Sequence, residues 1–121
     1  MEFQSNSQIS ENLPPMLRQY LEYKGRHPEA LLFFQVGDFY ELFFEDAVIT
    51  SKLLGLTLTS RDKNADTPIP MCGVPIAVID TYIGKLVGAG RAVAIVRQHG
   101  DPNARKGMME RKLERIVTPG V

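Results

Sequence analysis

The stretch LLFFQVGDFYE, residues 31–41, decides how the rest of the chain is interpreted. Its first half, residues 31–36, is apolar on both faces if extended, which is typical of a central strand. Its second half brings a glycine, an aromatic ring and a carboxylate to the end of that strand. Asp38 and Glu41 have the spacing of a capping box, so we predict that a helix begins at Asp38 and runs to about Leu54. Phe39 and Glu41 would then lie at the rim of a sheet, where a strand ends and a helix begins.

Two further helices are predicted on either side of this stretch. The first begins at Pro14 and Pro15, because proline is tolerated in the first turn of a helix, and it should stop near Gly25. The other follows Pro75 and ends near Gly88, where glycine is typical of a C-cap.

Further strands are predicted at residues 56–59, 92–96 and 113–117, where apolar or alternating residues lie between turn signals. Residues 68–73 contain two prolines and are expected to form a shaped loop or a sheet edge rather than a central strand. Because strands and helices alternate, the predicted class is α/β: a single domain with a mixed central β-sheet flanked by about three α-helices.

The length and composition are those of one globular domain. The chain has 121 residues, of which 44% are hydrophobic and 23% charged. Residues 1–12 are polar and are predicted to form a disordered tail, which leaves residues 13–121 as the domain. No stretch reaches the roughly 18 apolar residues of a membrane span, and the start lacks the apolar core of a signal peptide. Cys72 is the single cysteine, so no internal disulfide is possible. We therefore expect a cytoplasmic protein.

The charge is balanced overall but uneven along the chain. The net charge is +0, which argues against a strong free-standing nucleic-acid binder. Residues 91–121 hold seven Lys/Arg and three Asp/Glu, a net of +4, whereas residues 1–90 hold seven and eleven, a net of −4. The basic final third could face phosphates. Its candidate phosphate contacts are Arg105, Lys106, Arg111 and Lys112.

The residue patterns leave several functions open. Phe39 could be a buried first-turn residue, and Glu41 could serve only as half of a capping box. The carboxylates Asp38, Glu41, Glu45 and Asp46 could hold Mg²⁺ in a nuclease-like site. An exposed Phe39 could instead anchor a protein-interaction module. No G-x-x-x-x-G-K-[ST] motif is present, which argues against an NTPase site within these residues.

Several ordered motifs together carry a family resemblance. Phe39-x-Glu41, the segment 68–75 (PIPMCGVP), the triplet 100–102 (GDP) and the closing segment 115–120 (RIVTPG) resemble the N-terminal mismatch-recognition domain of the MutS DNA mismatch-repair family. The resemblance extends from about Leu17 to Val121. Two places depart from the family pattern: Ile76-Ala77 stands where Tyr-His is common, and Arg97 stands where Glu is frequent.

The resemblance implies a DNA lesion reader and not an enzyme. Phe39 would wedge into mismatched double-stranded DNA beside the mispaired base, and Glu41 would hydrogen-bond to that base. Arg61 and Met71 would approach the minor groove. No metal or cofactor is implied for these residues themselves.

The resemblance also implies a larger assembly. The chain would be a fragment of a longer protein that binds ATP and Mg²⁺ elsewhere. That parent would be a homodimer that recruits a MutL-type partner, and this domain would contact other domains of the same chain.

Overall fold

The computed structural model describes residues 13–61, 68–100 and 109–120. The predicted tail at residues 1–12 lies outside the described residues, as do Arg105 and Lys106.

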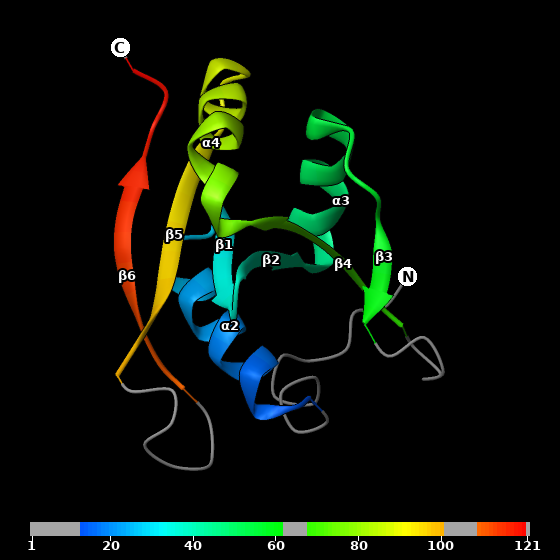
Figure 1. Cartoon of the computed structure of the whole chain (residues 1–121), viewed down its shortest axis with the longest axis vertical. Helices are drawn as coiled ribbons and strands as arrows, with labels where there is room; N and C mark the ends of the chain where they lie inside the picture. The colour runs from blue at the N-terminus through cyan, green and yellow to red at the C-terminus, as the bar shows by residue number, and fades with distance from the viewer. Residues whose placement is uncertain (1–12, 62–67, 101–108, 121) are drawn as a thin grey trace.

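A six-stranded mixed sheet, in the order β3-β4-β2-β1-β5-β6, forms the centre of the fold (Figure 1). Strands β1 and β5 pair in parallel, and the other neighbouring strands pair antiparallel. Together with the three α-helices of the described part, this confirms the predicted α/β class. The elements are α2 (Pro15–Arg26), β1 (Ala30–Val36), β2 (Phe39–Phe43), α3 (Phe44–Leu54), β3 (Thr59–Arg61), β4 (Ile69–Pro75), the 3-10 turn η1 (Ile76–Val78), α4 (Ile79–Gly88), β5 (Ala92–His99) and β6 (Glu110–Val117).

The sheet is covered on both faces. Helix α2 packs Leu17 and Tyr20 against one face, and α3 and α4 cover the other face (Figure 1). Alternation along β1 decides the sides: Leu32 and Phe34 face α2, whereas Leu31 and Phe33 face α3 and α4. Strand β1 is therefore buried on both faces, as its continuous apolar run predicts.

The predicted helix ends at Leu54 as expected, but its predicted start at Asp38 is wrong, because residues 39–43 form strand β2. Gly37 and Asp38 make the turn of a tight hairpin in which Val36 pairs with Phe39. Gly37 has a φ of +61°, which suits the first central residue of a two-residue hairpin turn. The proposed capping box of Asp38 and Glu41 is therefore not formed.

Helix α3 begins only at Phe44. This residue has a φ of +59°, which is rare for a bulky side chain and turns the backbone from the strand into the helix. No glycine or proline marks that switch, which explains why the pattern predicts a helix start six residues too early.

Residues 68–73 also depart from expectation. They contribute to β4, which pairs with β2 on one side and with β3 on the other, so the segment is neither a loop nor an edge. The strand expected at residues 56–59 is displaced to Thr59–Arg61. The predicted strands at residues 92–96 and 113–117 are confirmed within longer strands, and the helix after Pro75 ends at Gly88 as expected.

Candidate nucleic-acid interface

Phe39 lies at the rim of the sheet with its ring open to solvent. It is the first residue of β2, paired with Val36 on β1 and Pro75 on β4, and 46% of its surface is exposed. Tyr40, the next residue, is 2% exposed and packs into the core under α3 and α4. Strand alternation therefore sends Phe39 to the α2 side of the sheet, beyond the part covered by that helix.

Glu41 lies on the same face as Phe39, one pleat further into the sheet. Its cross-strand neighbours are Phe34 and Gly73. A Cβ atom at Gly73 would lie 3.3 Å from the Tyr40 carbonyl oxygen, which is tight, and 3.5 Å from the Glu41 Cγ atom, which is ordinary contact. A helix would have separated the two side chains by about 200° at about 100° per residue, whereas the strand places them side by side.

Burial raises the pKa of the Glu41 carboxyl, and the nearby guanidinium groups of Arg61 and Arg111 lower it in part. The net direction is upward, so the folded domain favours the protonated acid more than the unfolded chain does. A half-buried carboxyl with a raised pKa can donate as well as accept a hydrogen bond at moderately acid pH.

Replacing Glu41 with glutamine should make the domain more stable at neutral pH. Between the unfolded pKa and the raised folded pKa the native state holds more proton, so wild-type stability falls as pH rises through that window. Glutamine carries no charge, so the variant should lack this dependence of stability on pH. The check is urea unfolding of both proteins from about pH 4 to 8. If the free energies of unfolding of the two proteins change in parallel with pH across that range, the pKa of Glu41 does not differ between the folded and unfolded states.

Arg61 and Met71 are brought to the face that carries Phe39 and Glu41. Register places Met71 between Phe43 and Thr59, and Arg61 pairs with Ile69 at the end of β3. Both side chains are half-buried. Arg61 is close enough to affect the Glu41 pKa, so the structure joins it to the site.

The basic residues of the final strand do not act as one group. Lys112 is exposed and pairs with Arg97, on the sheet face opposite Phe39. Arg111 is only 7% exposed: its Nε donates to the Gln35 carbonyl at 2.9 Å, and its guanidinium lies 4.3 Å from the centre of the Phe34 ring. Burial lowers the Arg111 pKa. Arg111 is thus a buried structural cation in this fold and is not available to a phosphate.

The carboxylates of the nuclease alternative do not converge. Asp46 is buried, where it accepts from the Leu32 amide at 3.0 Å and pairs with Lys24 at 3.0 Å. Glu45 is exposed on α3, and Glu41 lies on the face toward α2. Across residues 13–61, 68–100 and 109–120, no three acidic, histidine or cysteine side chains come together to hold a metal.

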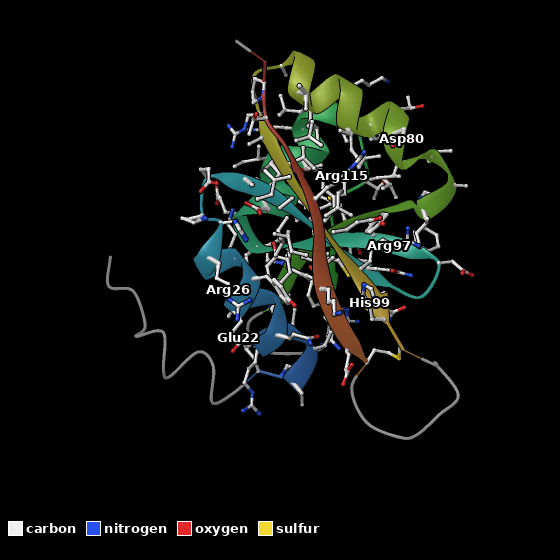
Figure 2. The ribbon with its side chains drawn as sticks, turned by 90° about the vertical axis from the view of Figure 1, so that its left-hand side faces the viewer. Glu22, Arg26, Asp80, Arg97, His99 and Arg115 are labelled. Atoms are coloured by element: carbon white, nitrogen blue, oxygen red, sulfur yellow. The ribbon has the colours of Figure 1, made fainter. Side chains whose placement is uncertain are left out.

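The two departures from the family pattern lie at different distances from this interface. Ile76 follows Pro75 directly, and its N–H donates to the Asp38 carbonyl at 3.0 Å, beside the Phe39 hairpin. Arg97 lies on the face of the sheet that α4 covers, and its guanidinium lies 3.7 Å from the Glu114 carboxylate. The exposed ion pair of Arg115 and Asp80 is nearby (Figure 2). The first departure therefore lies beside the hairpin that carries Phe39.

Three further residues of the interface were missed by the sequence reasoning. Gly73 and Pro75 pair with Glu41 and Phe39. Residues 68–73 were expected to form a shaped loop or a sheet edge, Pro75 was expected only to precede a helix, and strand register cannot be read from one sequence. Gln35 lies directly behind the hairpin turn and is inconspicuous in an apolar run. Among residues 13–61, 68–100 and 109–120, no helix is long and apolar enough to span a membrane.

Comparison with known proteins gives the same family as the motifs. Residues 14–121 match the family model described as MutS domain I. A DNA mismatch repair protein MutS from Thermodesulfovibrio yellowstonii is 54% identical over 110 residues, which is 91% of this chain and 13% of that relative. The chain therefore spans only a small part of this relative's length. It belongs to the MutS domain I family.

Proposed function

We propose that this domain recognises mispaired or unpaired bases in double-stranded DNA during mismatch repair. Phe39 is the wedge, and Glu41 hydrogen-bonds to the base beside it. The observation that carries the proposal is the placement of an exposed phenyl ring and a half-buried carboxylate side by side at the sheet rim, in a chain of the MutS domain I family.

The wedge works through the mechanical weakness of a mispair. Inserting an apolar ring costs a few kcal/mol of unstacking in regular DNA. A mispair is already poorly stacked, so it resists less, and the ring regains about 1–3 kcal/mol by stacking on a base. One phenyl ring can therefore serve many different mispairs.

Glu41 supports discrimination more than affinity. A carboxylate is repelled by phosphates, so it gains only where a base offers a free hydrogen-bonding edge. The burial that raises its pKa also lowers the cost of presenting a neutral acid to DNA.

The surrounding residues position the duplex. Arg61 and Met71 share the Phe39 face and are proposed to approach the minor groove. Arg105 and Lys106 remain proposed phosphate contacts. Lys112 lies on the sheet face opposite Phe39, and the Arg111 guanidinium is buried, so neither is carried forward.

The wider assembly is also part of the proposal. A domain of zero net charge needs a second DNA-gripping surface, because phosphate neutralisation supplies most of the affinity for DNA. By resemblance to the MutS family, we also propose that this domain is part of a longer, cytoplasmic, homodimeric protein that binds ATP and Mg²⁺ elsewhere and recruits a MutL-type partner. The domain itself carries no catalysis in this scheme.

The test compares the full-length protein and its Glu41→Gln variant on matched and singly mispaired duplexes of otherwise equal sequence. Wild type should prefer the mispaired duplex, and the variant should show a changed ratio of the two dissociation constants, because the amide removes repulsion from matched DNA. Equal binding of wild type to both duplexes would reject the proposed function. An unchanged ratio in the variant would remove the carboxylate charge from the mechanism.

A further inference from the structure

We propose that Gln35 and Arg111 are positioning residues that form a partly buried network behind Phe39 and hold the β1–β2 hairpin rigid during insertion. This inference rests on the proposed function, since the network affects DNA reading only if Phe39 enters the duplex. It replaces the expectation that Arg111 touches phosphate.

The hairpin turn is held from two sides. The Gln35 side-chain Nε2 donates to the Gly37 carbonyl at 3.1 Å. On the other side, the backbone N–H of Ile76 donates to the Asp38 carbonyl at 3.0 Å. Both turn residues therefore have their carbonyl groups fixed, immediately before Phe39 begins β2.

Gln35 is itself held in place by two other strands. Its Oε1 accepts from the backbone N–H of Gln98 on β5 at 2.8 Å. Its main-chain carbonyl accepts from Nε of Arg111 on β6 at 2.9 Å. The Gln35 side chain thus accepts a hydrogen bond from β5 and donates one to the turn, and these two bonds restrict its rotation.

Arg111 completes the network on the α2 side. A second guanidinium nitrogen donates to Gln19 Oε1 at 2.5 Å, and the group lies over the Phe34 ring. Burying a cation is costly unless its donors are satisfied. An apolar side chain would fill the same space but could not donate to the Gln35 carbonyl, so the arrangement favours a bracing role.

A wedge requires such backing. If the tip of the hairpin moves, Phe39 can tilt aside before the base pairs unstack. The difference in unstacking free energy between mispaired and matched DNA then no longer affects binding. Functional side chains generally need a supporting shell that holds them within about 0.5 Å. The network should therefore affect mismatch preference more than total DNA binding.

The test uses the full-length protein with Gln35→Ala, Arg111→Met, Phe39→Ala and the double variant Gln35→Ala/Phe39→Ala. Arg115→Met is the matched control, because it removes the same charge from the same strand at an exposed pair with Asp80. Dissociation constants for matched and mispaired duplexes are measured below the unfolding transition of each variant. Gln35→Ala and Arg111→Met should each lower mismatch preference about threefold to tenfold, which is the factor that one hydrogen bond of ordinary net strength represents. Matched-duplex affinity should stay near that of Arg115→Met.

The double variant separates positioning from general structure. In the Phe39→Ala background, Gln35→Ala should cause no further loss of preference, because there is no ring left to position. A further loss of the same size would show that Gln35 acts independently of Phe39 and would overturn the inference. If Arg111→Met fails to fold, the two Gln35 variants decide the outcome.

The failure of this inference is distinguishable from failure of the proposed function. Full preference in Gln35→Ala, alongside lost preference in Phe39→Ala, would reject the network and leave the wedge intact. Full preference in Phe39→Ala would reject the wedge itself and the inference with it.

Discussion

Replacing Phe39 with alanine should lower the preference of the full-length protein for mispaired over matched duplex by about tenfold or more. The alanine side chain cannot stack on a base, and stacking of one aromatic ring is worth about 1–3 kcal/mol. Binding to matched DNA should change far less, because the ring does not enter a well-stacked duplex in the proposed mechanism. Fluorescence anisotropy with labelled matched and mispaired duplexes, at several salt concentrations, measures both constants.

The same substitution should barely affect folding. Phe39 is 46% exposed and belongs to neither of the two core clusters, so its loss should change the free energy of unfolding by less than about 1 kcal/mol. Leu53→Ala is a matched control, because Leu53 is as exposed as Phe39 but belongs to helix α3 and not to the β1–β2 hairpin. If Phe39→Ala prefers mispaired DNA as strongly as Leu53→Ala does, the role of Phe39 as a wedge is refuted.

Asp46→Ala should produce the largest loss of stability, about 3 kcal/mol. The carboxylate is buried and joins three elements: it accepts from the Leu32 amide on β1, pairs with Lys24 on α2, and anchors the first turn of α3. Alanine would leave the buried Leu32 amide without its acceptor. It would also remove the counter-charge of the half-buried Lys24 ammonium, which would keep only the Pro28 and Ala30 carbonyl groups, and each of these losses is costly. Urea unfolding of wild type and variant, followed by circular dichroism, measures the difference.

Asp80→Ala is the matched control for this prediction. Asp80 also pairs with a cation, Arg115 at 3.1 Å, but its side chain is 88% exposed (Figure 2). Exposed ion pairs contribute only about 0–1 kcal/mol, so the control should stay close to wild type. Losses of similar size in the two variants would contradict the role assigned to the buried carboxylate.

The sequence alone was sufficient to predict the fold class and the family. Continuous apolar runs at residues 31–36 and 92–96 predicted two buried strands, and these pair in parallel at the middle of the sheet. Pro75 and Gly88 bracketed a helical segment, which consists of the 3-10 turn η1 and then α4 from Ile79, because proline fixes φ and glycine is disfavoured in a helix interior. The motif Phe39-x-Glu41, with the later segments, was enough to indicate the family that the comparisons show.

The local geometry of that motif was decided by tertiary structure. The carboxylate spacing around Asp38 fits a helix start, but residues 39–41 pair with β1 and residues 39–43 pair with β4, which satisfies the backbone and selects a strand. The change matters, because period-2 geometry is what places Phe39 and Glu41 side by side.

The partners of single side chains likewise depended on contacts distant in sequence. The basic segment around Arg111 predicts a surface cation. In the structure Arg111 is buried against Phe34 and the carbonyl of Gln35, and Gln35 is 76 residues away along the chain. Residue types and local spacing determined which groups this protein possesses. Strand order and register determined which of them are buried, which are presented together, and what each one touches, because those relations arise only when distant segments pack against one another.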